Sequence, residues 1–296
     1  MIKNILCPVD RSPSSLQAFS YAIALARWQG ARLNLLEVIE AARPKSSSRV
    51  PEDGHVPNDT RAALDRDLRR VLTARRASDV KVKIIMRKGN VVQEILAQAT
   101  ASQADLVVIG SHGRGGVQRL VLGSVAEKVL RLATCPVLTV RSGVRVKPRS
   151  RSPFGTILCA TDFSAAANRG VAYAKRLAKE AHAKFVVMHA VEWPFGDRVP
   201  SGPLGDLRKS IESSARDELV RLLPRSSSDG RGAQAVVTLG KASADIVKLA
   251  RARSVDLIVM GVSGRGAVDV AVLGSTTHHV IREGTWPVLT VRTVTR

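Results

Sequence analysis

Short apolar runs alternate with longer stretches of helical periodicity along the whole chain. In the first half, the runs are rich in Val, Ile and Leu and lie near residues 2–9, 32–39, 81–86, 105–109 and 136–140. The helix-period stretches lie between them, near 14–28, 61–76, 91–101 and 123–132. Strands that alternate with helices predict an α/β fold with a parallel sheet and right-handed crossovers. Because the runs are apolar at nearly every position, the sheet is expected to carry helices on both faces.

The second half of the chain repeats the first. Its strand-like runs lie near 156–161, 184–191, 234–238, 256–260 and 287–292. "ILCPVDRS" (5–12) matches "ILCATDFS" (157–164), and "TCPVLTVR" (134–141) matches "TWPVLTVR" (285–292), at an offset of 151 or 152 residues. A constant offset of this size indicates a duplicated domain. We therefore predict two tandem domains over 1–142 and 154–296, joined by a Ser-, Pro- and Arg-rich linker over 143–153.

Two segments interrupt this alternation, and the composition limits what the chain can be. Residues 41–58 and 194–206 carry clustered Pro, Gly and Ser and are predicted to be irregular loops at equivalent places. No apolar run is long enough to span a membrane, and the N-terminus does not resemble a signal peptide, so a cytosolic protein is expected. The three cysteines form no CxxC pair and are expected to be buried and unreactive.

The chain is strongly basic. Its 46 Lys and Arg against 25 Asp and Glu give a formal net charge of +21. Residues 1–148 hold 24 basic and 12 acidic residues, so the excess is spread over both halves rather than gathered in a tail. Such a charge favours acidic partners, and a nonspecific attraction to polyanions that weakens with salt is expected. No DNA- or RNA-binding motif is present and aromatic residues make up only 3%, so specific nucleic-acid recognition is not predicted.

A glycine-rich segment follows the fourth strand of each copy. "GSHGRGGVQRLVLGS" (110–124) and "GVSGRGAVDVAVLGS" (261–275) share the pattern G-x2-G-x9-G-S. This is neither a P-loop nor the dinucleotide-binding GxGxxG that follows a first strand. We interpret the first glycine as leaving room for a ligand and the second as permitting a turn with positive φ. The final Gly-Ser opens a helix whose N–H groups and dipole favour a phosphate. The alternative is a glycine-rich turn and a helix cap that serve stability alone.

An aspartate ends the first strand of each copy. Asp10 and Asp162 both follow an apolar run and precede x-Ser. Each is a candidate acceptor for ribose hydroxyls, and the alternative is a simple N-cap for the next helix. In open parallel sheets, ligands bind at the carboxyl ends of strands where the strand order reverses. A strand order of 3-2-1-4-5, which the sequence itself does not show, would bring each aspartate and its glycine loop to one crevice.

These segments resemble the universal stress protein family. "ILCPVD", "VVIGSHGRGG", "LGSVAEKVL" and "CPVLTVR" are similar to its hallmark segments, and the resemblance covers nearly all of the chain as a tandem member. It implies a five-stranded flavodoxin-like sheet in each domain and, in the ATP-binding branch, a bound adenine nucleotide. Any Mg²⁺ would come with the nucleotide, and no separate metal site is predicted.

The resemblance also implies the nucleotide-binding residues. In the first copy they are Pro8, Val9, Asp10, Val38 and Ile109 for the adenine and ribose, and Gly110, Gly113, Gly123, Ser124 and Val125 for the phosphates. In the second they are Ala160, Thr161, Asp162, Ala190, Met260, Gly261, Gly264, Gly274, Ser275 and Thr276. The second copy departs from the first at Val262 and Ser263 and at "TTHH" (276–279), but it keeps the motif glycines.

The expected function is nucleotide-dependent interaction in stress response or signalling rather than catalysis. A slow ATPase or phosphotransferase is the alternative, for which His112, Arg114 and Arg265 are the candidate residues in the glycine loops. The resemblance further implies pairing through the last strand, "PVLTV" at 136–140 and 287–291. Such pairing would make an internal pseudo-dimer of the two domains or a homodimer of two chains.

Overall fold

The computed structural model describes most of both copies. The described residues are 2–40, 62, 65, 66, 69, 70, 72, 73, 77–112, 122–144, 146, 152–193, 202–223, 232–262 and 273–292. The chain divides into two compact units, Met1–Val146 and Lys147–Arg296, and this division falls within the segment predicted as a linker. Among the described helices, none is both long and apolar enough to cross a membrane.

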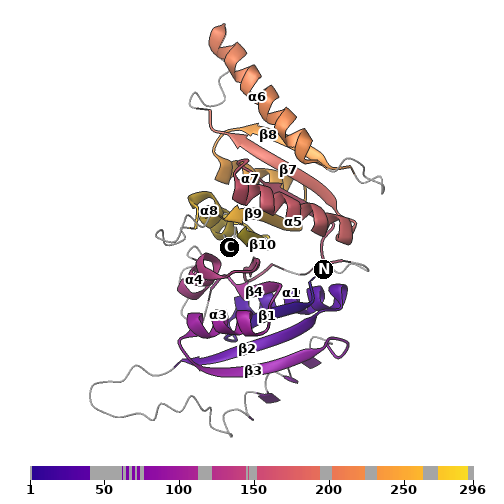
Figure 1. Ribbon diagram of the computed structural model, residues 1–296, viewed down its shortest axis with the longest axis vertical. Coiled ribbons are helices and arrows are strands. Elements are labelled where there is room, and N and C mark those ends of the chain that lie inside the picture. Colours follow the sequence, from indigo (N-terminus) through magenta and orange to yellow (C-terminus); the bar gives the residue numbers. More distant parts are fainter. Residues whose placement is uncertain are drawn as a thin grey trace, which may run out of the picture. The chain divides into compact units, whose positions relative to one another are not determined.

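The first unit contains one parallel sheet (Figure 1). Its strands are β1 (Asn4–Val9), β2 (Arg32–Glu40), β3 (Val82–Gly89), β4 (Leu106–Gly110) and β5 (Val137–Val140). Its fully bounded helices are α1 (Pro13–Gln29), α3 (Val91–Ala101) and α4 (Ser124–Leu132), and the described residues between 62 and 73 are also helical. The strands lie in the order β3-β2-β1-β4-β5, which is the order that the sequence left as an assumption.

The second unit repeats this arrangement. Its strands are β6 (Thr156–Ala160), β7 (Lys184–Val191), β8 (Gln234–Leu239), β9 (Leu257–Val262) and β10 (Val288–Arg292). Its helices are α5 (Ala165–Ala181), α6 (Pro203–Leu222), α7 (Ala242–Ala252) and α8 (Ser275–Glu283). The order β8-β7-β6-β9-β10 places the first strand of the unit, β6, between β7 and β9.

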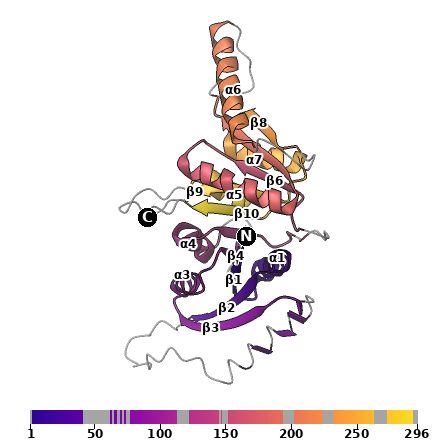
Figure 2. The ribbon, with the colours of Figure 1, turned by 45° about the vertical axis from the view of Figure 1, so that its right-hand side comes forward.

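Helices cover both faces of each sheet, as the apolar strands require. In the first unit α1 packs on one side of β1 and β4, while α3 and α4 pack together on the other side (Figure 2). In the second unit α5 contacts β6 and β9, α6 contacts β7 and β8, and α7 pairs with α8. Every residue of β4 is buried, which explains why its sequence shows no alternation of polar and apolar positions.

One predicted loop is shorter than expected. The sequence predicted irregular structure over 194–206, but α6 begins at Pro203. Proline is well suited to the first position of a helix, because the N–H that it lacks would have no partner there. The rest of this segment up to residue 201, and the predicted loop at 41–58, lie outside the described residues.

The same hydrogen bonds fix the start of the first strand in each of the two units. The carboxylate of Asp105 accepts hydrogen bonds from the backbone N–H groups of Lys3 (2.8 Å) and Asn4 (3.0 Å). The carboxylate of Asp256 does the same for Gly155 (2.8 Å) and Thr156 (3.0 Å). In each unit an aspartate just before the fourth strand therefore holds the first strand beside it.

We expect Asp256→Ala to lower the free energy of unfolding of the second unit by about 2–3 kcal/mol, since two backbone donors lose a charged acceptor. Asp256 is only 6% exposed, so water does not readily replace the lost partner. Chemical denaturation followed by circular dichroism measures the effect. The exposed Asp206→Ala is the control and should change stability little, and equal stability of the two variants would contradict the role given to Asp256.

The cysteines differ from one another more than the sequence indicated. Cys7 and Cys159 are buried, and burial raises the pKa of both thiols. Cys135 was also expected to be buried but is only partly so, because it lies in the turn before β5. Burial raises the pKa of Cys135 to about 11.

Because the thiolate is the reactive form and all three pKa values are raised, little labelling by a thiol reagent is expected at pH 7. As the pH rises toward the pKa of Cys135, that residue should be labelled first, and Cys7 and Cys159 only on unfolding. Mass spectrometry of peptides after timed labelling measures the order. Rapid labelling of Cys7 in the folded protein at neutral pH would contradict it.

Candidate nucleotide-binding site

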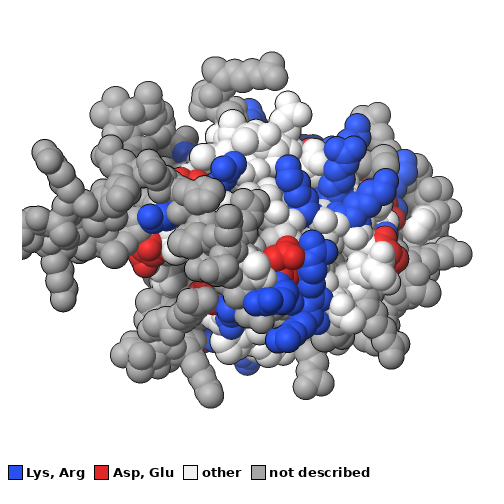
Figure 3. Space-filling model, turned by 90° about the horizontal axis from the view of Figure 1, so that it is seen from below, with Lys and Arg blue, Asp and Glu red and all other residues white. Residues whose placement is uncertain are grey.

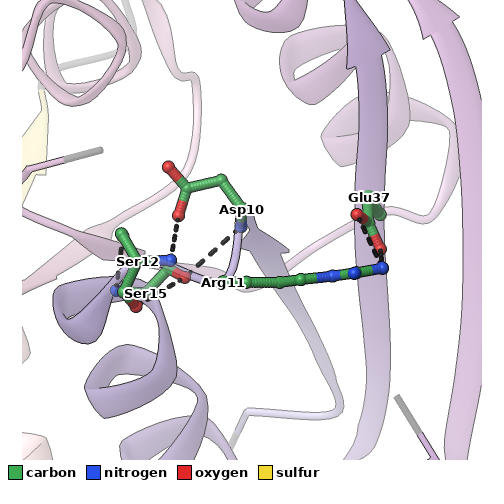
Figure 4. A network of polar contacts seen from close by, with 5 residues as sticks. All are labelled: Asp10, Arg11, Ser12, Ser15 and Glu37. Carbon is green, nitrogen blue, oxygen red and sulfur yellow. Dashed lines mark hydrogen bonds and ion pairs between the residues drawn. The ribbon is translucent and has the colours of Figure 1, made fainter. Parts of the chain in front are cut away.

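The corner between β1 and α1 holds Asp10 in a defined position (Figure 4). Oδ1 of Asp10 accepts a hydrogen bond from the N–H of Ser12 (3.0 Å), and the N–H of Asp10 donates to Oγ of Ser15 (3.3 Å). Arg11 between them adopts a left-handed conformation with φ 65°. The N-cap of α1 is Ser12, whose hydroxyl accepts from the N–H of Ser15 (3.3 Å). The alternative that Asp10 itself caps the helix is therefore wrong, and its carboxylate instead closes a turn at the end of β1.

The second unit has the same corner. Oδ1 of Asp162 accepts from the N–H of Ser164 (3.0 Å), and Ser164 is the N-cap of α5. Phe163 takes the left-handed conformation that Arg11 takes in the first unit, with φ 62°. Thr161 supports the turn, because its Oγ1 accepts from the N–H of Phe163 (3.0 Å). The local sequence D-x-S thus specifies one turn in both copies, and this turn fixes each aspartate at the carboxyl end of the sheet.

The glycine that ends the fourth strand has a different role from the predicted one. A Cβ on Gly110 would lie 2.7 Å from the backbone nitrogen of Ser15 and 2.8 Å from the carbonyl carbon of Ser14. A Cβ on Gly261 would lie 2.5 Å from the nitrogen of Ala167. These glycines allow the strand to approach the first turn of α1 or α5, so the prediction that they leave room for a ligand is wrong.

This close approach joins the aspartate corner to the start of the glycine loop. The carbonyl oxygen of His112 accepts from Oγ of Ser12 (3.2 Å) and from Oγ of Ser14. The carbonyl oxygen of Ser111 accepts from the N–H of Gly123 (2.8 Å), just before α4 begins. The ends of β1 and β4 and the beginning of α4 are therefore connected by hydrogen bonds, although residues 10, 112 and 123 are far apart in sequence.

The helices that follow the glycine loops begin without a capping side chain. Gly123 is the N-cap of α4 and Gly274 is the N-cap of α8, and neither helix has a side-chain cap. Ser124 and Val125 are the first residues of α4, and Ser275 and Thr276 are the first residues of α8. Ser124 and Ser275 are exposed, so an anion can reach both helix starts. Gly113 and Gly264, the middle glycines of the motif, lie outside the described residues.

The remaining predicted residues lie at the carboxyl ends of neighbouring strands. In the first unit these are Pro8 and Val9 on β1, Val38 on β2 and Ile109 on β4. In the second they are Ala160 on β6, Thr161 just after it, Ala190 on β7 and Met260 on β9. Val38, Ala160 and Ala190 are partly exposed, whereas the other five are buried. In each unit the topology thus brings these residues together at the carboxyl ends of the strands, next to the aspartate corner.

Beside each aspartate lies a pair of side chains that the sequence did not single out. Arg11 and Glu37 form an ion pair with a distance of 3.4 Å, and the Glu37 side chain is only 7% exposed (Figure 4). At the matching positions of the second unit, the rings of Phe163 and His189 are in contact with centroids 4.5 Å apart. Nδ1 of His189 also lies 2.8 Å from the carbonyl oxygen of Thr161. The sequence contains one signal for the Arg11–Glu37 pair, which is that Glu37 is a charged residue inside the apolar run at 32–39.

The second unit also holds buried polar atoms without a partner near the same edge. Oγ1 of Thr238, Oγ of Ser243 and Oδ2 of Asp245 are buried and make no hydrogen bond among the described residues. Thr238 is the register neighbour of Ala190, and the other two lie in the first turn of α7. Unpaired buried polar atoms cost free energy, so this corner is suited to a polar ligand or water.

Comparisons with known proteins agree with this architecture. The chain matches the universal stress protein family over residues 1–141 and again over 153–292. The chain belongs to the universal stress protein family. Each of its two units corresponds to one universal stress protein domain, as the sequence repeat predicted.

Two relatives illustrate this correspondence. The universal stress protein YxiE of Bacillus subtilis is 34% identical over 150 residues, which are 48% of this chain and the whole of YxiE. A universal stress protein of Thermus aquaticus is 36% identical over 141 residues, again 48% of this chain and all of the relative. Single-domain universal stress proteins thus match one copy of the repeat.

A solved structure matches the whole tandem chain. The crystal structure of a universal stress protein from Archaeoglobus fulgidus covers 98% of this chain and 98% of its own, with a TM-score of 0.68 and 23% identity. Because the identity is only 23%, this likeness is evidence for the fold alone, and the shared fold is a tandem pair of α/β universal stress protein domains.

Proposed function

We propose that each unit of this universal stress protein binds ATP, together with Mg²⁺, at the carboxyl edge of its sheet. The observation that carries the proposal is the set of hydrogen bonds from Ser12 and Ser14 to His112 and from Gly123 to Ser111. These bonds hold a carboxylate corner and the uncapped start of a helix against the same strand end. A sugar and a polyphosphate need these two features side by side.

The residues present fit the parts of the nucleotide. The N–H groups at the start of α4 and α8 have no side-chain cap, so they favour the phosphates through hydrogen bonds and the helix dipole. Asp10 and Asp162 would accept hydrogen bonds from the ribose hydroxyls. The apolar ends of β1, β2 and β4 and their counterparts would contact the adenine. Mg²⁺ would be bound mainly by phosphate oxygens and water.

The two sites should not be equivalent. An ion pair, Arg11 with Glu37, lies beside the first aspartate, whereas an aromatic pair, Phe163 with His189, lies beside the second. The residue in register with Val38 is Arg87, and the residue in register with Ala190 is Thr238. The first site therefore has more charge around the sugar and base, and we expect the two affinities for ATP to differ.

We propose that nucleotide occupancy changes the interactions of this protein and that catalysis is not its main activity. Of the candidate catalytic residues in the glycine loops, Arg114 and Arg265 lie outside the described residues. His112 has Nδ1 2.7 Å from Oγ of Ser111, and the matching residue of the second unit is Ser263. One histidine in one of two sites is a poor basis for a shared catalytic mechanism.

Calorimetric titration with Mg-ATP tests the binding, and release of phosphate from the same samples tests the alternative of an ATPase. We expect saturable heat with turnover below about one per minute, because His112, the candidate catalytic residue that the structure describes, has a serine at the matching position of the second unit. The absence of both heat and any rise in Tm would contradict the binding proposal. Fast turnover that is lost in Gly113→Ala would favour the enzyme instead.

A further inference from the structure

A pocket lies in the first unit at the end of the sheet opposite to Asp10. Its volume is about 350 Å³. It is lined by Asn4, Arg32, Asn34, Lys81, Val82, Lys83, Gln98, Ala101 and Ser102. Asn4, Arg32 and Val82 are the first residues of β1, β2 and β3, and Gln98 and Ala101 belong to the last turns of α3. The pocket is thus at the amino ends of the strands, away from the edge that carries Asp10.

Asn34 is the unusual residue of this pocket. It is only 8% exposed and is the third residue of β2, between Leu33 and Leu35, which are fully buried. Its side-chain amide makes no hydrogen bond within the described part of the chain, although it can both donate and accept. Because Asn34 lines the pocket, its amide is available to form hydrogen bonds with a ligand there.

Positive charge surrounds the same pocket. Arg32, Lys81 and Lys83 are exposed at its rim, and none of the three forms an ion pair with a described carboxylate. Arg32 is in register with Asn4, and Lys83 is in register with Asn34, so these side chains belong to the same face of the sheet. Figure 3 views the lower end of Figure 1 and shows several Lys and Arg side chains on this face of the molecule, with some Asp and Glu beside them. Among the described residues, none that lines the pocket carries a carboxylate.

The second unit does not keep this set of residues. Asn34 is matched by Val186, Gln98 by Leu249 and Lys83 by Gln234. Lys81 is matched by Gly232. Val186 is 3% exposed, so the second unit builds the same part of its sheet with the apolar side chain that a buried strand position favours. The amide and the charges are therefore not a requirement of the fold.

We propose that this pocket binds a small phosphorylated molecule of about the size of a sugar phosphate. A phosphate group carries nearly two negative charges at neutral pH, which suits a pocket with three cations at its rim better than a single carboxylate does. The side-chain amides of Asn34 and Gln98 line the pocket and would donate hydrogen bonds to the uncharged part of the ligand, although Oε1 of Gln98 already accepts from Arg87 (3.4 Å). The volume lies within the usual range for small-molecule sites. This site is separate from the nucleotide sites and does not depend on their occupancy.

Calorimetric titration of the full chain with glucose 6-phosphate, at fixed salt and with saturating Mg-ATP, tests the proposal. We expect saturable binding that Asn34→Val weakens by about tenfold or more, since one buried hydrogen-bonding group is lost. Arg32→Ala should also weaken binding. The matched control is Lys184→Ala, which removes the equivalent residue of the second unit and should leave the affinity unchanged. Inorganic phosphate should bind more weakly than the sugar phosphate and show the same dependence on Arg32.

Asn34→Val also gives a readout that does not need the ligand. It introduces the residue that the second unit already has at this position, Val186, so it should fold, and the Tm of the free protein should not fall below that of the wild type. Equal affinity of wild type, Asn34→Val and Arg32→Ala for glucose 6-phosphate would overturn the proposal, and so would the absence of binding. Binding of a single-stranded DNA oligomer that is equally sensitive to Arg32→Ala but insensitive to Asn34→Val would also overturn it, in favour of a surface for nucleic acid.

Discussion

Gly261→Ala is expected to lower the free energy of unfolding of the second unit by about 2–3 kcal/mol, because overpacking of a close contact forces the backbone to move. The added Cβ would lie 2.5 Å from both the nitrogen of Ala167 and the carbonyl carbon of Ala166, and these are backbone atoms that cannot rotate away. Gly170 of α5 lies on the same contact, with its Cβ position 3.1 Å from the nitrogen of Gly261. The strand and the helix would therefore have to separate.

The control for this variant is Gly232→Ala, because a Cβ on Gly232 meets no atom within 4 Å. It should change stability by no more than about 0.5 kcal/mol. Differential scanning calorimetry of both variants and of the wild type measures the difference. If Gly261→Ala proved as stable as Gly232→Ala, the close packing of β9 on α5 would not be the reason for a glycine there.

Ser124→Asp is expected to lower the affinity of the first unit for ATP by about 100-fold, because a carboxylate would lie beside the phosphates. The same change should leave the fold intact and even stabilise α4, since an acidic residue in the first turn interacts favourably with the helix dipole. A loss of binding together with unchanged or higher Tm would separate this effect from unfolding. Titration calorimetry with Mg-ATP and thermal unfolding without it provide the two measurements.

The matched control is Ser124→Asn, which has nearly the same shape as the aspartate variant but no charge. It should retain affinity within a few-fold, because the backbone N–H groups of α4 remain in place. Ser275→Asp and Ser275→Asn make the same comparison at the start of α8 in the second unit. Equal affinities of the Asp and Asn variants would show that no phosphate lies at these helix ends.

The sequence predicted the elements of the fold well because the signals for them are local. Apolar runs marked each of the ten strands that the described residues form, and the repeated segments marked the two units. The strand order within a unit needed an assumption, because no local pattern states which strands are neighbours. Composition alone did not predict where α6 begins. The helix starts at Pro203, inside a Pro- and Gly-rich segment that was predicted to be a loop.

Roles that depend on contacts between distant segments were harder to predict. Gly110 was predicted to leave room for a ligand. The structure instead explains the glycine by the close approach of Ser14 and Ser15, which lie about 95 residues earlier in the chain. Asp10 was expected at the end of the first strand and lies directly after β1, but the alternative of a helix cap is wrong, because its turn depends on the φ of Arg11. The Arg11–Glu37 pair and the Asn34 pocket join strands that are adjacent only in the folded sheet. Nucleotide binding and the pairing of the last strands stay predictions.

Native mass spectrometry of the chain with Mg-ATP tests the central claim most directly, because it counts the nucleotides on each molecule. We predict two bound nucleotides on the wild type, one on Ser124→Asp and one on Ser275→Asp, and none on the double variant. A wild-type chain that carries no nucleotide at saturating Mg-ATP, or a double variant that still carries two, would contradict binding at the starts of α4 and α8.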